Sequence, residues 1–531
     1  MVETSEHGEA SADECAPIAS RARWLPVILV GLGVMAFATW VISPRFTLQA
    51  PSLVDDWWAI SPPAEELHPI LGVQGRFRPG WDLWFAVQWS TLDAPRGLVG
   101  PNVWNVARIA SLVFGLCVMT ALTFPAPTRR REALLQAGLA ACPALLVVQV
   151  PEFARDLARF GPQEPLLLGG MTLGGSLLVL AARSLIDANR PLQRWQTVAL
   201  ALAGGSLWVL GMYHKETSLA AAPLVAAVLY AGRARRKGWS SLATRRRLSL
   251  LAIAAVVALP LAHVVVESLL ILARGDLVYG AKIDAGRGIL SGLRELWDGA
   301  SKILPPVVSL VAGGAVLLIV IVSVLRRRFD TLALGALASG ALTIVVAAQT
   351  GVAAPRYYLP AYALLAIALS LSVARLARVV QLLVLALVLG TAVTSTAARD
   401  EVRRWAEIEE AEAAVVRAVA DLEPECVVAL AGVDLERTYS LPALVAFERD
   451  PARRKCTTSG VHFVTGQGAE GRALLAACAP RALAPVLEAG RFLALHRCSR
   501  LHARAVRDPS FGLVDPEELV ELRRLRAPRR T

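Results

Sequence analysis

The feature that most constrains this chain is a succession of long apolar segments. A membrane-spanning helix needs about 20 predominantly apolar residues, and the first such segment, residues 24–42, reads WLPVILVGLGVMAFATWVI. It is too long and too apolar at its far end for a signal peptide, and no small-residue cleavage site follows it. We interpret it as a retained helix. The sequence predicts eleven spans, at residues 24–42, 106–124, 133–149, 165–182, 196–212, 218–231, 249–272, 304–325, 331–349, 358–374 and 379–396.

Composition excludes a soluble globular enzyme and a disordered chain. Hydrophobic residues make up 55% of the 531 residues, and charged residues only 18%, against about 25% in an average soluble domain. A water-soluble protein cannot bury that much apolar surface and keep a wettable exterior. The sequence therefore predicts an α-helical polytopic membrane protein.

The formal net charge of +12 is explained by orientation. Short loops dense in Lys and Arg stay in the cytoplasm, and every second connection between the predicted spans is rich in arginine. These connections include residues 21–23, 129–131, 183–194, 233–247, 326–328 and 375–378. From residue 401 onward the tail is nearly neutral, with 20 basic and 19 acidic residues. The pattern predicts a cytoplasmic N-terminus and an outer C-terminus, and it gives no indication of nucleic-acid binding.

This topology divides the chain into three parts. Residues 1–23 are predicted to be a disordered cytoplasmic tail, and residues 24–396 form the transmembrane domain. Two sizeable loops of that domain, at 43–105 and 273–304, are predicted to lie outside. Residues 397–531 are predicted to form a small extracytoplasmic α/β or α+β domain.

The tail mixes helix and strand signals. Residues 403–422 are charged and amphipathic, which predicts a helix, and residues 426–431, 462–465 and 492–496 are strand candidates. An even number of cysteines in a region placed outside suggests disulfides, with three possible connectivities. A zinc site is less favoured because no CxxC pair is present. The four candidates are Cys426, Cys456, Cys478 and Cys498.

Two adjacent carboxylates, Asp55 and Asp56, follow the first span. Adjacent side chains diverge, so one could act as general base towards an acceptor hydroxyl while the other holds a metal ion or positions the first. The alternative is a solvated turn next to the interfacial tryptophans Trp57 and Trp58.

Three further ionisable residues fall at span boundaries on the same predicted side. Glu164 opens the fourth span, Lys215 lies in the short link between the fifth and sixth, and Arg356 precedes the tenth. Lys215 could meet a phosphate or a carboxylate, or could simply balance its neighbour Glu216. Arg356 could bind a phosphate through two parallel hydrogen bonds, or could be a snorkelling interfacial arginine.

Within the seventh span, His263 and Glu267 are one helical turn apart and share a face. Ionisable groups inside a membrane usually face a polar cavity, although a helix-packing pair is the alternative. Acids that could activate a hydroxyl, next to cations that could bind a phosphate, suit transfer from a phosphate-linked lipid donor.

Several motifs occur in the order seen in one family of membrane enzymes. The outer loop carries Asp55–Asp56 and then residues 77–115, beginning FRPGWDLWF; later come QEPLLLGG from Gln163, HKETSLAAAPL from His214 and PRYYLPAYALL from Pro355. Across residues 24–400 this pattern resembles the GT-C superfamily of membrane glycosyltransferases. The superfamily includes protein O-mannosyltransferases and the aminoarabinose transferases that modify lipid A.

The resemblance implies an inverting transfer of a sugar from a polyprenyl-phosphate donor to a lipid, glycan or protein acceptor outside the cytoplasm of a bacterial-type inner membrane. It implies Asp55 as catalytic base, with Asp56 as its helper or alternate, and a divalent metal ion is an open expectation. It implies donor-phosphate contacts at Lys215 and Arg356, and cavity or metal-binding residues at Glu164 and His263. Glu267 is a further cavity or metal-binding candidate because it shares a helix face with His263.

Some members of the superfamily carry tetratricopeptide repeats, and none is visible in this sequence. The tail also matches no motif of the family. A transporter or lipid flippase is the main alternative. It is less favoured because no repeated halves are visible and the large outer loop and tail suit an enzyme better. A non-catalytic scaffold that functions through its tail is the third reading.

Overall fold

The computed structural model describes most of the apolar part of the chain and short pieces of the tail. The described residues are 15–47, 79–91, 99–124, 127, 129–160, 163–186, 192–231, 243–274, 294, 298, 331–349, 355–394, 396–420, 427–430, 462–464 and 492–495. Among them, eight helices are long and apolar enough to cross a membrane. The protein is a multi-pass helical membrane protein.

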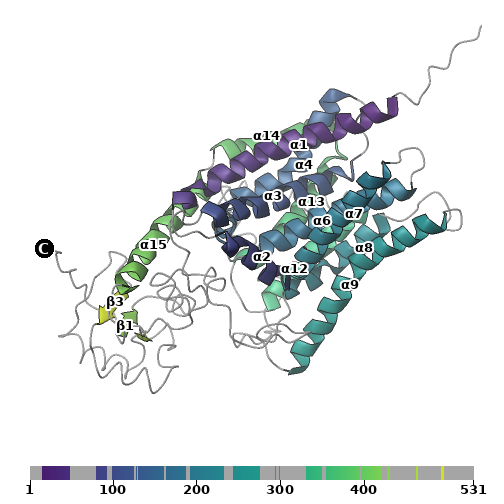
Figure 1. The fold of residues 1–531 in the computed structure, drawn as a ribbon. Helices are drawn as coiled ribbons and strands as arrows, with labels where there is room; N and C mark the ends of the chain where they lie inside the picture. Colours follow the sequence, from purple (N-terminus) through teal and green to yellow (C-terminus); the bar gives the residue numbers. More distant parts are fainter. Residues whose placement is uncertain are drawn as a thin grey trace, which may run out of the picture.

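Figure 1 shows the helices of the bundle packed alongside one another. Three short 3-10 helices lie next to longer ones: η1 follows α1, η3 precedes α8 and η6 precedes α13. The elements are α1 (Cys15–Ile42), η1 (Ser43–Thr47), α2 (Pro79–Ser90), α3 (Val99–Ala121), α4 (Arg130–Gln149), α5 (Pro151–Ala158), α6 (Glu164–Ile186), α7 (Arg194–Met212), η3 (Glu216–Ala221), α8 (Ala222–Ala231), α9 (Thr244–Arg274), α12 (Thr331–Gln349), η6 (Pro355–Tyr358), α13 (Leu359–Val373), α14 (Arg378–Thr394) and α15 (Ala397–Ala420).

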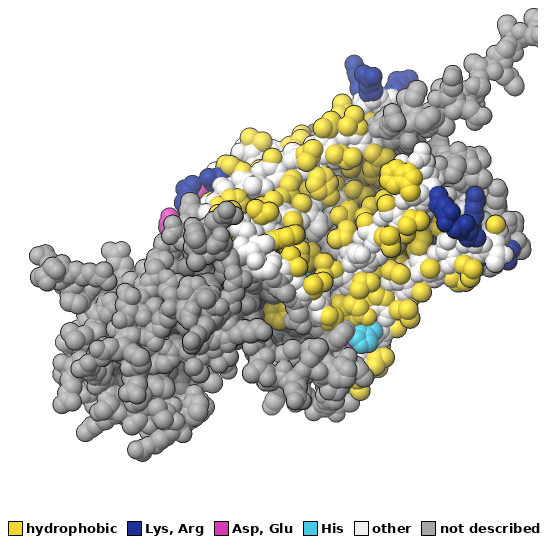
Figure 2. Space-filling model, in the orientation of Figure 1, with side chains coloured by type: hydrophobic (Ala, Val, Ile, Leu, Met, Phe, Trp, Pro, Cys, Tyr) yellow, Lys and Arg dark blue, Asp and Glu magenta, His cyan; other side chains and the backbone are white. Residues whose placement is uncertain are grey.

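The surface of the bundle is apolar, as a lipid-facing surface must be. Figure 2 shows hydrophobic side chains over most of the visible bundle. Large residues on this surface are strongly exposed, including Leu202 at 67%, Leu259 at 65% and Val393 at 84%. In water such an area would drive aggregation, whereas in a bilayer lipid chains cover it.

Small residues allow α6 to pack closely against its neighbours. A Cβ atom added to Gly174 of α6 would lie 2.6 Å from the backbone nitrogen of Trp208 in α7. Gly170 of α6 and Gly211 of α7 face each other in the same way, since a Cβ on Gly211 would lie 3.0 Å from the Cα of Gly170. Helices in membranes associate through such small-residue contacts, so these glycines fix α6 and α7 side by side.

The antiparallel packing of α6 and α7 defines the ends of the bundle. The start of α6 and the end of α7 lie together, and we call this the site end. α5 and η6 also contact each other there.

A three-stranded sheet follows α15, which leads away from the bundle (Figure 1). Its strands are β1 (Val427–Leu430), β2 (His462–Val464) and β3 (Phe492–Leu495). The central strand β1 pairs parallel to β2 and antiparallel to β3, with Val427 opposite His462 on one side and Leu495 on the other. The strands lie within the three segments that the sequence predicts, and α15 includes most of the predicted charged helix.

Ten of the eleven predicted spans coincide with a helix of the structure, and the predicted span at 304–325 lies outside the described residues. Two of the ten are shorter than a full span, at Thr217–Ala231 and Thr331–Ala347. The number eleven therefore stays a prediction. The first helix begins at Cys15, so part of the predicted N-terminal tail is helical.

Candidate functional site: a buried charge cluster

Residues from three predicted motifs meet at the site end. The Lys215 ammonium forms a hydrogen-bonded ion pair with the Glu164 carboxylate, and the two residues are 9% and 1% exposed. The same ammonium lies 3.8 Å from the centroid of the Tyr357 ring, within the range of a cation–π interaction. The Arg356 guanidinium is 5.5 Å from that ring centroid. Two cations, one acid and one aromatic ring thus form the centre of the site.

Local structure explains why these side chains converge. Glu164 is the first residue of α6, and Lys215 follows the end of α7, so the antiparallel pair brings them to the same level. Lys215 is extended, with φ −160° and ψ 147°, and serves as the N-cap of η3. Arg356 and Tyr357 lie on η6 immediately before α13 begins. The sequence placed these positions on one side, and the structure brings them together.

The short helix α5 forms a second wall of the site, and α3 holds its end. The last carbonyl groups of a helix lack partners within that helix. Here the Asn105 side-chain amide donates to the carbonyl oxygens of Leu157 and Ala158, at 3.1 and 3.2 Å. Arg108 donates to the carbonyl oxygen of Leu157 at 3.0 Å and to that of Phe160 at 3.2 Å. These contacts fix α5 against the bundle.

Asp156 of α5 is a buried carboxylate with an unusual environment. It is 1% exposed, and neither oxygen has a hydrogen-bond partner within the described part of the chain. Arg155 Nε and Arg159 Nη1 approach its Oδ1 at 3.6 and 3.9 Å, longer than hydrogen bonds. Burial raises the pKa of Asp156 above its usual range, while Arg155, Arg159 and Arg356 act in the opposite direction. Asp156 therefore lies within the electrostatic field of the site.

α15 supplies a further acid. Glu409 forms an ion pair with Arg45 of η1 and lies 3.5 Å from Arg159 Nε through its Oε1. The Trp405 ring of the same helix lies under two arginines, 4.9 Å from the Arg155 guanidinium carbon and 5.0 Å from that of Arg159. α15 is therefore held against α5 by these contacts.

These contacts link eight charged side chains, which we call the charge cluster. Five are basic and three acidic, so the linked set carries two surplus positive charges if all are ionised. Surplus cations in a largely buried cluster favour an anionic ligand, because solvent screens their charge less than at an open surface. The members are Arg45, Arg155, Asp156, Arg159, Glu164, Lys215, Arg356 and Glu409.

The predicted pair of His263 and Glu267 lies on α9, near the end of α7. The His263 and Tyr213 rings meet edge to face, with centroids 5.4 Å apart. Glu267 is 1% exposed. Burial, with a further contribution from Glu267, raises the pKa of Tyr213 above its usual range. His263 and Glu267 therefore share the surroundings of Tyr213, two residues before Lys215.

Two further predicted site residues and the predicted disulfide cysteines are not among the described residues. Asp55 and Asp56 lie outside the described residues, as do the four tail cysteines. Cys117 and Cys142, which the sequence places inside spans, are buried free thiols. Within the described ranges no three His, Cys, Asp or Glu side chains gather as a metal site would require. Asp55 and Asp56 lie outside those ranges, so the expected divalent metal ion stays a prediction.

Sequence reasoning missed five members of the charge cluster: Arg45, Arg155, Asp156, Arg159 and Glu409. They lie in short polar segments or on a charged helix, where charges are usually solvated. One signal was available: Arg108 lies within a predicted span, and an ionisable residue at membrane depth marks a polar interior.

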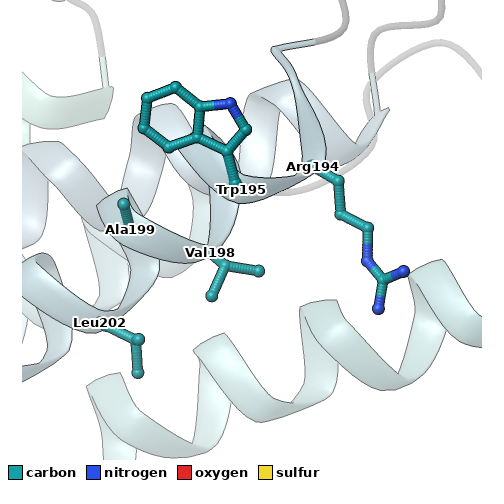
Figure 3. Close-up of a pocket in the computed structure, with 5 residues that line it drawn as sticks. All are labelled: Arg194, Trp195, Val198, Ala199 and Leu202. Atoms are coloured by element: carbon teal, nitrogen blue, oxygen red, sulfur yellow. The ribbon is translucent and has the colours of Figure 1, made fainter.

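A separate hollow lies at the opposite end of α7 from Lys215 (Figure 3). It has a volume of about 540 Å³. Its lining is mostly apolar and comes from one helix, and Trp195 is 65% exposed. Lipid chains would fill such a hollow in a bilayer. Its lining residues are Arg194, Trp195, Val198, Ala199 and Leu202.

The chain matches no protein-family model, and no curated protein matches it.

Proposed function

We propose that this protein is a membrane glycosyltransferase that transfers a sugar from a polyprenyl-phosphate donor to an acceptor on the extracytoplasmic side. The observation that supports the proposal best is the convergence of Glu164, Lys215 and Arg356. These residues come from three motifs far apart in the sequence, and each motif resembles one of the GT-C superfamily. A buried ammonium and a half-buried guanidinium next to an aromatic ring form a suitable environment for a lipid-linked phosphate.

In the proposed reaction, one group of residues activates the acceptor hydroxyl and another stabilises the leaving phosphate. Asp55 accepts the proton of the acceptor hydroxyl as its oxygen attacks the anomeric carbon of the sugar. The bond between that carbon and the phosphate oxygen breaks, and polyprenyl phosphate leaves with the bonding electrons. Lys215 and Arg356 stabilise the charge on the leaving phosphate. Asp56 positions Asp55 or takes its place as the base.

Lys215 would share its ammonium group between Glu164 and the phosphate. Since an ammonium has three hydrogen-bond donors, it can keep the Glu164 contact and add one to a ligand. Glu164 then holds Lys215 in place in the absence of donor, while Arg356 is the second phosphate contact. His263 and Glu267 lie near Tyr213, two residues before Lys215.

The proposal includes eleven spans in a bacterial-type inner membrane, with the N-terminus in the cytoplasm. The charge cluster and the domain at 397–531 then lie outside. This sidedness suits disulfides among Cys426, Cys456, Cys478 and Cys498. If mass mapping of the exported protein under non-reducing conditions found four free thiols, both the disulfides and the outer location would lose support.

A profile of lipid-linked sugars in cells with and without the gene tests the proposal. We expect one polyprenyl-phosphate sugar to accumulate when the gene is deleted, and complementation with the wild-type gene to remove it. A transporter or flippase would instead move the lipid-linked sugar across the membrane without cleaving the sugar–phosphate bond. Donor that accumulates only on the cytoplasmic face would therefore favour transport over transfer.

A further inference from the structure

We propose that α15 fixes the geometry of the charge cluster, with Glu409 and Trp405 acting as positioning residues for Arg159 and Asp156. The region after the last span would then be part of the scaffold of the site. The structural half of this proposal stands independently, whereas its effect on sugar transfer rests on the proposed function.

Glu409 joins three elements that are distant in the sequence. Its Oε2 accepts a hydrogen bond from Arg45 of η1, which follows α1, and its Oε1 lies 3.5 Å from Arg159 at the end of α5. The side chains of Arg45, Arg159 and Glu409 are 2%, 6% and 4% exposed. Ion pairs buried to this degree are weakly screened by solvent, so removing the charge of Glu409 takes a close counter-charge away from both arginines.

Trp405 lies one helical turn before Glu409, so both side chains project from the same face of α15. Its ring contacts the guanidinium groups of Arg155 and Arg159, at 4.9 and 5.0 Å. A planar ring beneath a guanidinium restricts its orientation as well as attracting its charge. Arg159 is therefore held by a carboxylate and by an aromatic face, both from α15.

Arg159 connects α15 to the centre of the site. Its Nη1 lies 3.9 Å from Asp156 Oδ1, and Asp156 interacts electrostatically with both Arg356 and Glu164. Because Asp156 has no hydrogen-bond partner among the described residues, neighbouring charges and packing determine where its side chain lies. A displacement of Arg159 would thus be transmitted to Asp156 and on to the predicted phosphate contacts.

The near end of α15 has its own attachment, so Glu409 can be tested separately. Arg399 donates to the carbonyl oxygen of Trp40 at 2.8 Å, and its guanidinium carbon lies 4.4 Å from that ring centroid. These contacts to α1 remain when Glu409 is changed. α15 should then stay joined to the bundle at its first turn while its contact with α5 is lost.

Hydrogen exchange of the full-length protein in lipid nanodiscs provides the first test. Glu409→Gln keeps the shape of the side chain and removes its charge. Asp400→Asn makes the same kind of change elsewhere on α15 and serves as the control, because the Asp400 side chain is 54% exposed. We expect Glu409→Gln to accelerate amide exchange by at least about tenfold in α5 and in residues 405–420, because breaking a buried ion pair favours local opening. α6 and α7 should exchange as in the wild type, and Asp400→Asn should change none of these segments.

Unchanged exchange in α5 would overturn the proposal, whether or not α15 itself opens. If Glu409→Gln fails to fold, Trp405→Leu serves as the second variant, because it removes the aromatic face and leaves every charge in place. It should accelerate exchange in α5 with the same segment pattern. Wild-type rates in α5 for this variant would contradict the role of Trp405.

Transfer kinetics with a polyprenyl-phosphate sugar provide the second test. We expect Glu409→Gln to lower kcat by roughly tenfold to a hundredfold, as small misplacements of a site do, with a smaller change in KM. Glu409→Asp keeps the carboxylate and should restore most of kcat, whereas a solely structural role would leave kcat of folded protein unchanged in both variants. Absence of transfer by the wild type would refute the proposed function, and the exchange result would still decide the role of α15.

Discussion

Replacing Lys215 with methionine tests whether the centre of the charge cluster is as buried as the structure indicates. Lys215 is 9% exposed, Glu164 is 1% exposed, and the two form a hydrogen-bonded ion pair. Methionine keeps much of the apolar stem of lysine and removes its charge. The variant therefore leaves the Glu164 carboxylate buried without its closest cation.

The expected cost follows from the burial of both partners. Removing one member of a buried ion pair typically destabilises a protein by about 3–5 kcal/mol. Loss of the ammonium above the Tyr357 ring adds about 0.5–2 kcal/mol, while Arg356 remains close enough to act on Glu164 electrostatically and offsets part of the cost. We expect a net loss of about 3 kcal/mol in the free energy of unfolding.

The assay is equilibrium unfolding in mixed micelles with increasing SDS, followed by tryptophan fluorescence. A double-mutant cycle of Lys215→Met, Glu164→Gln and the double variant isolates the interaction between the two side chains. We expect the double variant to be more stable than Lys215→Met alone, with a coupling energy of about 2 kcal/mol or more. If all three variants unfold within about 0.5 kcal/mol of the wild type, the pair is solvated and the account of a buried cluster is refuted.

Three further predictions follow from individual residues. Gly174→Ala should cost about 1–3 kcal/mol, because the added Cβ would lie 2.6 Å from the backbone nitrogen of Trp208, whereas Gly33→Ala has nothing within 4 Å and should be tolerated; SDS unfolding compares the two. The pKa of Asp156 is higher in the folded protein than in the unfolded chain. Protonation of Asp156 therefore stabilises the folded state fully below the unfolded pKa, and this stabilisation is lost as pH rises through the folded pKa. The melting temperature of the wild type relative to Asp156→Asn should therefore rise on acidification through that window, and an unchanged difference would contradict the burial. Arg356→Lys keeps the charge but loses the planar fork, so donor binding and stabilisation of the leaving phosphate should both weaken, with kcat/KM for the polyprenyl-phosphate sugar lower by roughly tenfold or more and part of that loss in kcat; an unchanged kcat/KM would exclude Arg356 from the donor site.

The positions of the membrane helices are largely predictable from sequence, because length and hydropathy determine what can cross a bilayer. The span predicted at 165–182 is α6, Glu164–Ile186, and the span predicted at 358–374 is α13, Leu359–Val373. The ends differ by a few residues because helices continue beyond the hydrocarbon region. The start of α1 at Cys15 is an example.

The convergence of the site was predictable from topology, whereas its ion pairs were not. Counting spans predicts that Glu164, Lys215 and Arg356 lie on one side of the membrane. Glu164 begins the fourth predicted span, Lys215 lies between the fifth and sixth, and Arg356 precedes the tenth. The sequence leaves the partner of Lys215 open, with the adjacent Glu216 as one candidate. The observed partner is Glu164, 51 positions away, and only the antiparallel packing of α6 on α7 selects it.

The role of α15 was beyond sequence reasoning. Its charged, amphipathic pattern correctly predicts a helix, but the same pattern is typical of a solvated surface. Glu409 is buried because α15 packs on α5, and that contact depends on how the tail leaves the bundle. Asp156 was missed for a related reason, since a short polar segment between two spans resembles an ordinary loop.

The central claim is that the protein transfers a sugar from a polyprenyl phosphate with an acid of the first outer loop as base. The most direct measurement is single-turnover transfer by purified protein in liposomes that contain a radiolabelled polyprenyl-phosphate sugar and candidate acceptors. We expect cleavage of the sugar–phosphate bond by the wild type and none by Asp55→Asn, although the variant folds and binds the lipid. Full activity of both Asp55→Asn and Asp56→Asn would contradict the assigned site, and no cleavage of any such donor by the wild type would contradict the claim itself.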